Sequence, residues 1–197
     1  MAPAKSTRSA MVGNLEELIK PYLETEIFSE VLELARQNSE GKIWLMGGFL
    51  YKNIAAALYG GETYTKDIDL IVEKRNVSLK QVPNWIIETN SYGVANYTRL
   101  DCKMSMTDIR KAIRVSNMVN PTVEEFIEET PLNIQSIALD LDKKVLIGKR
   151  GIDALNKRVV KVNNLPQAKY YAERKRKSLE TIIIEKANEL NFEYELP

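Results

Sequence analysis

The 197-residue sequence contains no histidine and only one cysteine, Cys102. The absence of histidine excludes Ser–His–Asp catalysis, acid–base catalysis by imidazole and histidine-ligated metal sites. A lone cysteine excludes a disulfide within the chain and favours a reducing cytoplasm, and we expect Cys102 to be inert core packing. Chemistry therefore has to come from carboxylates, lysine, tyrosine or a metal ion bound by oxygen ligands.

Long apolar runs and a strong excess of one charge are also lacking. No run approaches the roughly 20 apolar residues that a membrane-spanning helix needs, so no membrane association is expected. The formal net charge is +1, so binding of nucleic acid would require a local basic patch. We expect a disordered N-terminus over residues 1–12, one domain over 13–165 and a C-terminal helical segment over 166–197.

The apolar patterning of the remaining sequence is that of a globular protein with helices and strands in irregular order. It predicts an α+β (mixed α/β) fold, with a mixed β-sheet flanked by helices. Period-2 or short apolar runs predict strands over 43–46 and 67–74 and one or two strands within 94–106. Helical spacing predicts a helix over 49–59 and another over 79–90 with a break near Pro83.

Two aspartates, Asp67 and Asp69, interrupt the apolar strand predicted over 67–74. Side chains alternate along a strand, so both carboxylates lie on one face, with their backbone positions about 6.5–7 Å apart, and Ile68 and Leu70 lie on the other. Paired carboxylates hold two divalent ions at the roughly 3.5–4 Å separation used in phosphoryl transfer. Bound Mg²⁺ or Mn²⁺ would offset the cost of placing two acids there. Taken alone, Asp-x-Asp is more often a strand end that meets solvent.

The pair Gly47-Gly48 lies between the strand over 43–46 and the helix that follows. Such a bend brings the backbone close to phosphates and points the first helix amides at an anion, although a Gly-Gly pair alone is more often a simple turn.

A third acid, Asp101, is a candidate metal ligand. Alternation in "TRLDCKMSM" places it with Lys103 on the polar side of a strand that could neighbour Asp67 and Asp69. It is equally compatible with an ordinary exposed strand residue.

The stretch "MGGFLYKNIAAALYGGETYTKDIDLIV" resembles the signature of the polymerase-β-like nucleotidyltransferase superfamily: a glycine pair after a strand, a helix, then Asp-x-Asp on the next strand. Further on, "TPLNIQSIALDLDKKVLIGKRGIDALNKRVVKV" is similar to the head domain of CCA-adding enzymes and bacterial poly(A) polymerases. The resemblance extends from about Lys42 to Glu195, and its specific part is the Gly-Gly and Asp-x-Asp core.

The resemblance implies a Mg²⁺-dependent nucleotidyltransferase that moves a nucleoside monophosphate from a nucleoside triphosphate to an acceptor hydroxyl and releases pyrophosphate. An RNA or tRNA 3′ end is the first candidate acceptor. The segment "KYYAERKRK" (169–177) is a candidate RNA contact because it combines charge with stacking tyrosines, though such charge runs are usually solvated. The implied metal and catalytic residues are Asp67, Asp69 and Asp101, and the implied nucleotide contacts are Gly47, Gly48, Lys52, Lys66, Asn133 and Gln135.

The sequence departs from the family pattern in several places. The link from the glycines to Asp67 is longer, and Glu129-Thr130-Pro131 stands where family members have Arg-Arg-Asp. Leu50-Tyr51-Lys52 stands where family members have Val-Arg-Asp after the glycines, so that Lys52 would replace the basic residue with a shift of one position. The base-selecting Glu-Asp-x-x-Arg motif is not found in "AERKRKSLETII", and the sequence ends where family members continue into tRNA-binding helices. These departures leave two alternatives open. One is a stand-alone transferase of a toxin–antitoxin or defence system that modifies a protein or small molecule, and the other is a catalytically silent binding protein with the same fold.

Overall fold

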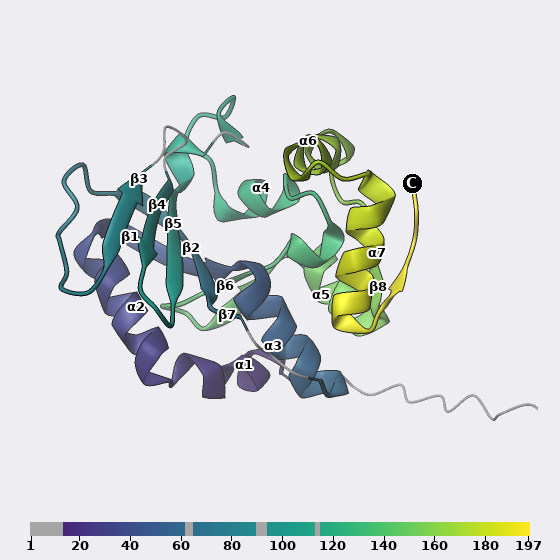
Figure 1. Cartoon of the computed structure of the whole chain (residues 1–197), viewed down its shortest axis with the longest axis horizontal. Helices are drawn as coiled ribbons and strands as arrows, with labels where there is room; N and C mark the ends of the chain where they lie inside the picture. The colour runs from purple at the N-terminus through teal and green to yellow at the C-terminus, as the bar shows by residue number, and fades with distance from the viewer. Residues whose placement is uncertain (1–13, 62–64, 90–93, 113–114) are drawn as a thin grey trace, which may run out of the picture.

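The computed structural model of this chain describes residues 14–61, 65–89, 94–112 and 115–197. The chain forms a seven-stranded sheet with the strand order β3-β4-β5-β2-β1-β6-β7. In Figure 1 strands β1 to β5 lie on the left, and helices α4 to α7 lie on the right. The predicted mixed sheet flanked by helices is therefore confirmed. The predicted disorder of residues 1–12 lies outside the described residues.

The bounds of the elements are as follows. The α-helices are α1 (Leu15–Leu23), α2 (Glu26–Gln37), α3 (Gly47–Tyr59), α4 (Val123–Glu128), α5 (Lys149–Lys157), α6 (Leu165–Lys175) and α7 (Leu179–Leu190), and the 3₁₀ turns are η1 (Ile109–Lys111) and η3 (Asn133–Gln135). The strands are β1 (Ser39–Met46), β2 (Asp67–Arg75), β3 (Ile86–Thr89), β4 (Val94–Thr98), β5 (Lys103–Asp108), β6 (Ala138–Asp140), β7 (Val145–Ile147), β8 (Val159–Val160) and β9 (Glu193–Tyr194).

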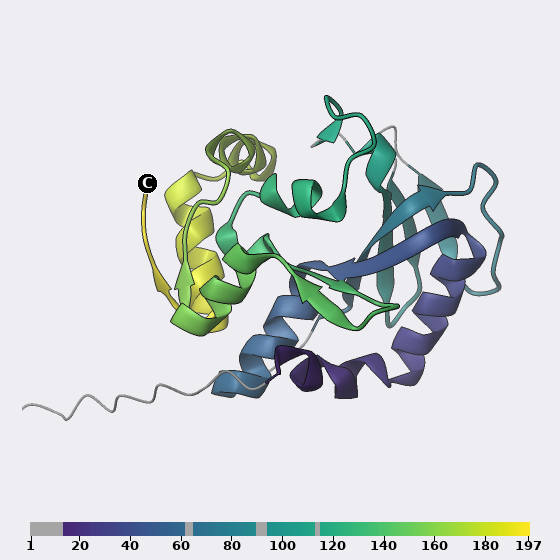
Figure 2. The same cartoon turned by 180° about the vertical axis from the view of Figure 1, so that it is seen from behind.

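The centre of the sheet is formed by β1, β2 and β5. Strand β2 runs antiparallel to β1 and parallel to β5. The other neighbours in the sheet are antiparallel, and β6 and β7 lie on the side of β1 away from β2 (Figure 2). A separate two-stranded sheet joins β8 to β9.

Different helices cover the two faces of the central strands. Ile68, Leu70 and Val72 of β2 belong to the larger apolar cluster, which includes residues of α1, α2 and α3. Ile71, on the opposite face, packs in a second and smaller cluster with α4. Asp67 and Asp69 share the face of Ile71 because side chains alternate along the strand.

The prediction of a helix over 79–90 is wrong for residues 79–89, the part of this range that the structure describes. Asn84 has a positive φ of 69°, and the chain then enters β3, which pairs with β4 at the edge of the sheet. Pro83 disfavours helix at the residue before it, and the β-branched pair Ile86-Ile87 suits a strand. The apolar residues of this segment have helical spacing, but residues 86–89 form a strand because they pair with β4, which follows in the sequence.

The C-terminal helices pack into the same core as the sheet. Ile183 and Ala187 of α7 are fully buried in the larger apolar cluster, and β9 pairs with β8. Helix α4 lies between the sheet and α6 (Figures 1 and 2). The domain boundary at residue 165 stays a prediction. None of the described helices is long and apolar enough to cross a membrane.

We expect Ile183→Ala to lower the free energy of unfolding by about 2–5 kcal/mol, because it leaves a cavity in the shared core. The matched control is Ile86→Ala on the edge strand, where the side chain is 67% exposed and the cost should be about 0.5 kcal/mol or less. Urea unfolding followed by circular dichroism measures both. Equal effects of the two substitutions would show that α7 is not integrated into this core.

Candidate active site

The two aspartates of the Asp-x-Asp motif lie next to polar residues of β5. In the parallel ladder Asp67 is opposite Lys103, and Asp69 is opposite Ser105. Asp67 is exposed and Asp69 is partly buried. Directly opposed residues of paired strands project to the same face, so the sheet itself brings these four side chains together.

A glycine bend brings the start of α3 against Asp69. Strand β1 ends at Met46, which pairs with Asp69, and the next residue, Gly47, has a φ of +75°. A Cβ atom at Gly47 would lie 3.0 Å from both the Cβ and the Cγ of Asp69. Glycine is thus required both for the backbone conformation and for the close approach.

The amino terminus of α3 adjoins the cavity beside Asp69, because Gly47 is one of the residues that line it. The helix has 13 residues, and the side chain of its N-cap residue, Met46, makes no capping hydrogen bond. The first amides of a helix lack partners within the helix, and together with the helix dipole they stabilise negative charge at this end. Gly48 contributes less to the packing, since a Cβ there would only approach the flexible side chain of Lys52, at 3.3 Å.

Ser105 is a site residue that the sequence interpretation missed. Its hydroxyl donates a hydrogen bond to Oδ1 of Asp69 and so orients that carboxylate from the neighbouring strand. The signal was present in "KMSM", because the buried Met104 and Met106 direct Ser105 to the opposite face. The pairing of β5 with β2, which brings Ser105 beside Asp69, could not be predicted from the sequence pattern.

These residues line a cavity of about 780 Å³. Its floor is formed by the polar face of β2, β5 and β4, and its other walls include residues of α4, η3 and α6. Acidic and basic side chains therefore face one space. The lining residues used in the argument below are Gly47, Asp67, Asp69, Lys103, Ser105, Gln135, Tyr170, Arg174 and Lys175.

The donor set of the cavity suits a hard cation. Asp67 and Asp69 supply carboxylate oxygens on adjacent positions of one face, and Mg²⁺ is commonly bound by one or two carboxylates together with substrate phosphates. No group of three or more acidic or thiol side chains placed to hold a metal occurs within the described ranges. Two carboxylates thus fit an ion that completes its shell with water or phosphate oxygens.

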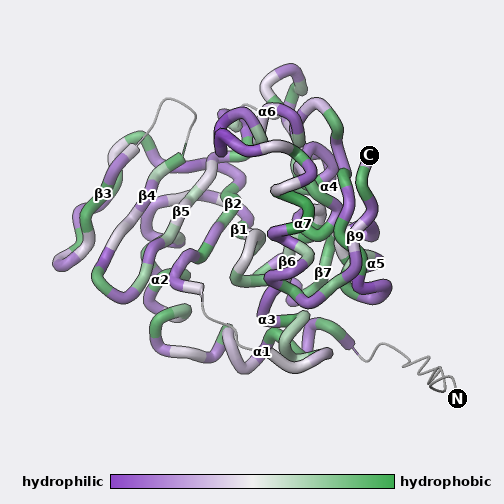
Figure 3. Tube along the Cα trace, turned by 45° about the vertical axis from the view of Figure 1, so that its right-hand side comes forward, coloured by the Kyte–Doolittle hydropathy of each residue, from purple (hydrophilic) through white to green (hydrophobic). Residues whose placement is uncertain are grey.

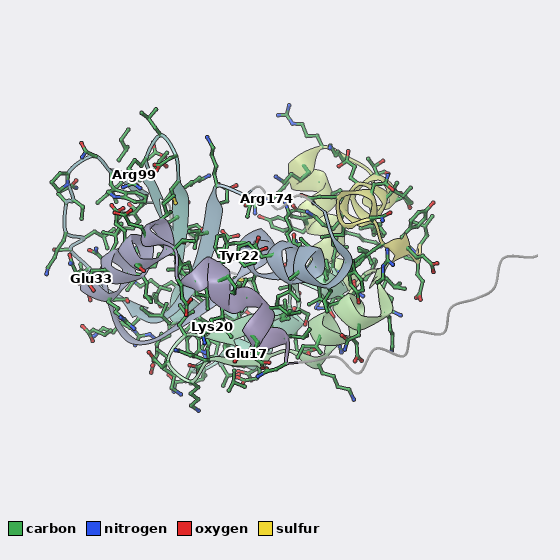
Figure 4. All side chains as sticks on the ribbon, turned by 90° about the horizontal axis from the view of Figure 1, so that it is seen from below. Glu17, Lys20, Tyr22, Glu33, Arg99 and Arg174 are labelled. Carbon is green, nitrogen blue, oxygen red and sulfur yellow. The ribbon has the colours of Figure 1, made fainter. Side chains whose placement is uncertain are left out.

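The structure corrects the placement of Asp101, which precedes β5 instead of lying on it. Arg99 donates hydrogen bonds to both oxygens of Asp101, at 2.7 and 3.2 Å, and also binds Glu30 of α2. The guanidinium holds the pKa of Asp101 below its usual value. Figure 4 shows Arg99 at the end of the sheet beside α2, away from Arg174. Asp101 is not a lining residue of the cavity.

Cys102 follows the expectation of core packing. It is a buried free thiol, and burial raises its pKa to about 11.

The other predicted nucleotide contacts divide into two groups. Gln135 lines the cavity, while its Oε1 accepts a hydrogen bond from the backbone N–H of Leu132. Lys52 points instead to α7, where it forms an ion pair with Glu189. Lys66 is exposed just before β2, and its carbonyl accepts the N–H of Lys103 at 2.8 Å. Neither lysine is among the residues that line the cavity.

Asn133 also lies outside this cavity and has a structural role. Its Nδ2 donates to the carbonyl of Val159, and its Oδ1 accepts from the N–H groups of Ile134 and Lys161, each at 2.9 Å. The side chain therefore ties η3 to β8.

The basic segment 169–177 forms one wall of the cavity. Tyr170, Arg174 and Lys175 line it from α6, which Figure 3 shows as a mostly hydrophilic helix, and Arg174 lies between the sheet and the C-terminal helices (Figure 4). Lys177, at the end of the segment, is paired with Glu185 of α7. Part of the predicted RNA-contacting segment thus shares a space with the two aspartates.

Solved structures of tRNA nucleotidyltransferases share this fold. A tRNA-processing enzyme in an apo form superposes with a TM-score of 0.56 at 17% identity, over 87% of this chain and 44% of that one. The CCA-adding enzyme of Bacillus stearothermophilus in complex with CTP gives 0.54 at 18% identity, over 87% and 41%. A tRNA nucleotidyltransferase complexed with a primer tRNA and an incoming ATP analogue gives 0.52 at 17%, over 78% and 43%.

The chain spans less than half the length of these proteins. The likeness confirms that the chain shares its fold with part of these tRNA nucleotidyltransferases, as the sequence resemblance predicted. No protein-family model matches the sequence, and no curated protein matches it either.

We expect Asn133→Ala to lower the free energy of unfolding by about 1–3 kcal/mol. The backbone groups of Ile134, Val159 and Lys161 would lose the hydrogen bonds that the Asn133 side chain makes with them. Asn156→Ala on the exposed surface of α5 is the control and should change stability by about 0.5 kcal/mol or less. Thermal or urea unfolding gives both values. A stable Asn133→Ala protein would contradict the structural role.

Proposed function

We propose that this chain is a nucleotidyltransferase that binds a nucleoside triphosphate with a divalent ion at Asp67 and Asp69 and transfers its nucleotidyl group to a hydroxyl. The observation that carries the proposal is the contact between the Gly47 bend and Asp69. It joins a helix amino terminus, suited to phosphates, to a pair of carboxylates suited to Mg²⁺.

The chain's residues have distinct tasks in this reaction. The amides at the start of α3 bind phosphate oxygens, and Asp67 and Asp69 hold Mg²⁺ or Mn²⁺, which when bound neutralises charge that develops on the phosphates. Ser105 orients Asp69. The acceptor oxygen forms a bond to the α-phosphorus, the bond from that phosphorus to the bridging oxygen breaks, and pyrophosphate leaves with the electron pair while the hydroxyl proton passes to water.

An RNA 3′ end is the acceptor that we propose. The wall of the cavity opposite the aspartates carries Arg174 and Lys175, which suit a phosphate backbone, and Tyr170, which suits stacking on a base. The similar structures include one with a primer tRNA and one with CTP. A protein or small-molecule acceptor is the competing possibility, and the same assay distinguishes it.

We expect Asp67→Asn to reduce nucleotidyl transfer by about 100-fold or more, because the change removes a metal ligand while it keeps the side-chain shape. Purified protein is incubated with radiolabelled ATP or CTP, Mg²⁺ and total RNA, and label is measured in RNA and in polypeptide. Asp101→Asn is the matched control and should retain activity within about threefold, since its carboxylate is bound by Arg99 outside the cavity.

Wild-type activity that survives Asp67→Asn would remove the proposal. Label in polypeptide instead of RNA would keep the transfer chemistry and replace the acceptor. Absence of both labelling and nucleotide binding would favour the silent binding protein.

We expect the double change Arg174→Ala and Lys175→Ala to weaken binding of single-stranded RNA and to flatten its dependence on salt. Two lost phosphate contacts should reduce the slope of log K against log salt concentration by roughly 1.4. Lys169→Ala is the control, because Lys169 is exposed on α6 but does not line the cavity. Fluorescence anisotropy with labelled RNA measures the slopes. Equal slopes for the double variant and the wild type would exclude α6 as the RNA contact.

A further inference from the structure

We infer that Lys103 binds a phosphate of the nucleotide and that this site holds one divalent ion for each nucleotide, not two. The inference rests on the proposed function and specifies which groups of its site neutralise the phosphate charge. It concerns the position opposite Asp67 on β5, where a carboxylate could have helped to hold a second ion and the chain has a lysine instead.

Lys103 is fixed beside Asp67 by the sheet. The two residues are directly opposed in the parallel ladder, where neighbouring strands lie about 4.8 Å apart. The N–H of Lys103 bonds to the carbonyl of Lys66 at 2.8 Å, which holds the start of β5 level with the start of β2. Both Lys103 and Asp67 are exposed and line the same cavity.

No carboxylate of β5 reaches this face. The positions that project toward the cavity are Lys103, Ser105 and Thr107. Asp101, the nearest acid before the strand, is bound by Arg99. Among the described lining residues the acids are Asp67 and Asp69 alone.

The charges of the site favour a phosphate over a second cation at this position. A lysine ammonium is a compact positive charge that repels a divalent ion but attracts phosphate oxygens. Its flexible stem reaches across the gap between the strands. Asp67 and Asp69 would hold one ion, and Lys103 beside them would neutralise phosphate charge that a second ion neutralises in a two-ion site.

The test counts ions and nucleotides on the intact chain. Equilibrium dialysis with Mn²⁺ and a non-hydrolysable ATP or CTP analogue gives the ratio of bound ion to bound nucleotide, and calorimetry gives the affinity for the analogue. The proteins compared are the wild type, Lys103→Ala, Lys103→Glu and the control Lys20→Ala on exposed α1 (Figure 4). Melting curves confirm that each variant is folded.

We expect one bound ion per nucleotide for the wild type and for Lys20→Ala. Lys103→Ala should keep that ratio and bind the analogue about 10-fold more weakly, as is typical of a lost charged hydrogen bond. Lys103→Glu should raise the ratio toward two, because a carboxylate then stands beside Asp67.

Three results would overturn the inference. A wild-type ratio of two ions per nucleotide would show that a second ion binds despite Lys103. An unchanged affinity of Lys103→Ala for the analogue would show that Lys103 does not bind the phosphate. Both would leave the proposed transferase standing. A folded wild-type protein that binds neither analogue would remove the proposed function and the inference together.

Discussion

The parallel pairing of β2 with β5 is the constraint on which the site depends. Its register is held by apolar side chains on the hidden face, among them Ile68, Leu70, Met104 and Met106. A slip of one residue would turn these side chains to the cavity and drive the aspartates into the core, at a large cost in free energy. The packing of one face therefore fixes the chemistry of the other.

The cavity results from unequal cover over the two faces of the sheet. Helices α1, α2 and α3 contribute to the cluster that buries the apolar face, whereas α4 packs over Trp44 and Ile71 on the opposite side. On the same side of the sheet, Asp67 and Asp69 face the cavity, and α6 forms another of its walls. Polar residues there keep access to solvent and ligands, which avoids the penalty of burying unpaired charge.

The contrast between Asp101 and Lys103 shows how neighbouring charged residues acquire different tasks. Arg99 lies over the ring of Trp85 at 4.9 Å and joins Glu30 to Asp101, so this acid belongs to a network that fastens the sheet to α2. Two residues later Lys103 starts the strand and faces the cavity. The prediction of a polar face was right for Lys103, while the strand begins after Asp101. The difference is where β5 starts, which depends on its bond to Lys66.

The sequence by itself determined the local features: the glycine bend before α3, the alternation that puts Asp67 and Asp69 on one face, and the overall mixture of helices and strands. These follow from residue conformation and from periods of two or 3.6 residues, which are properties of short segments. Only the tertiary structure decided which strand lies beside β2, that Ser105 holds Asp69, that Asn133 binds backbone and that α6 faces the aspartates. Such contacts join residues far apart in the chain, and their register depends on packing of the whole core.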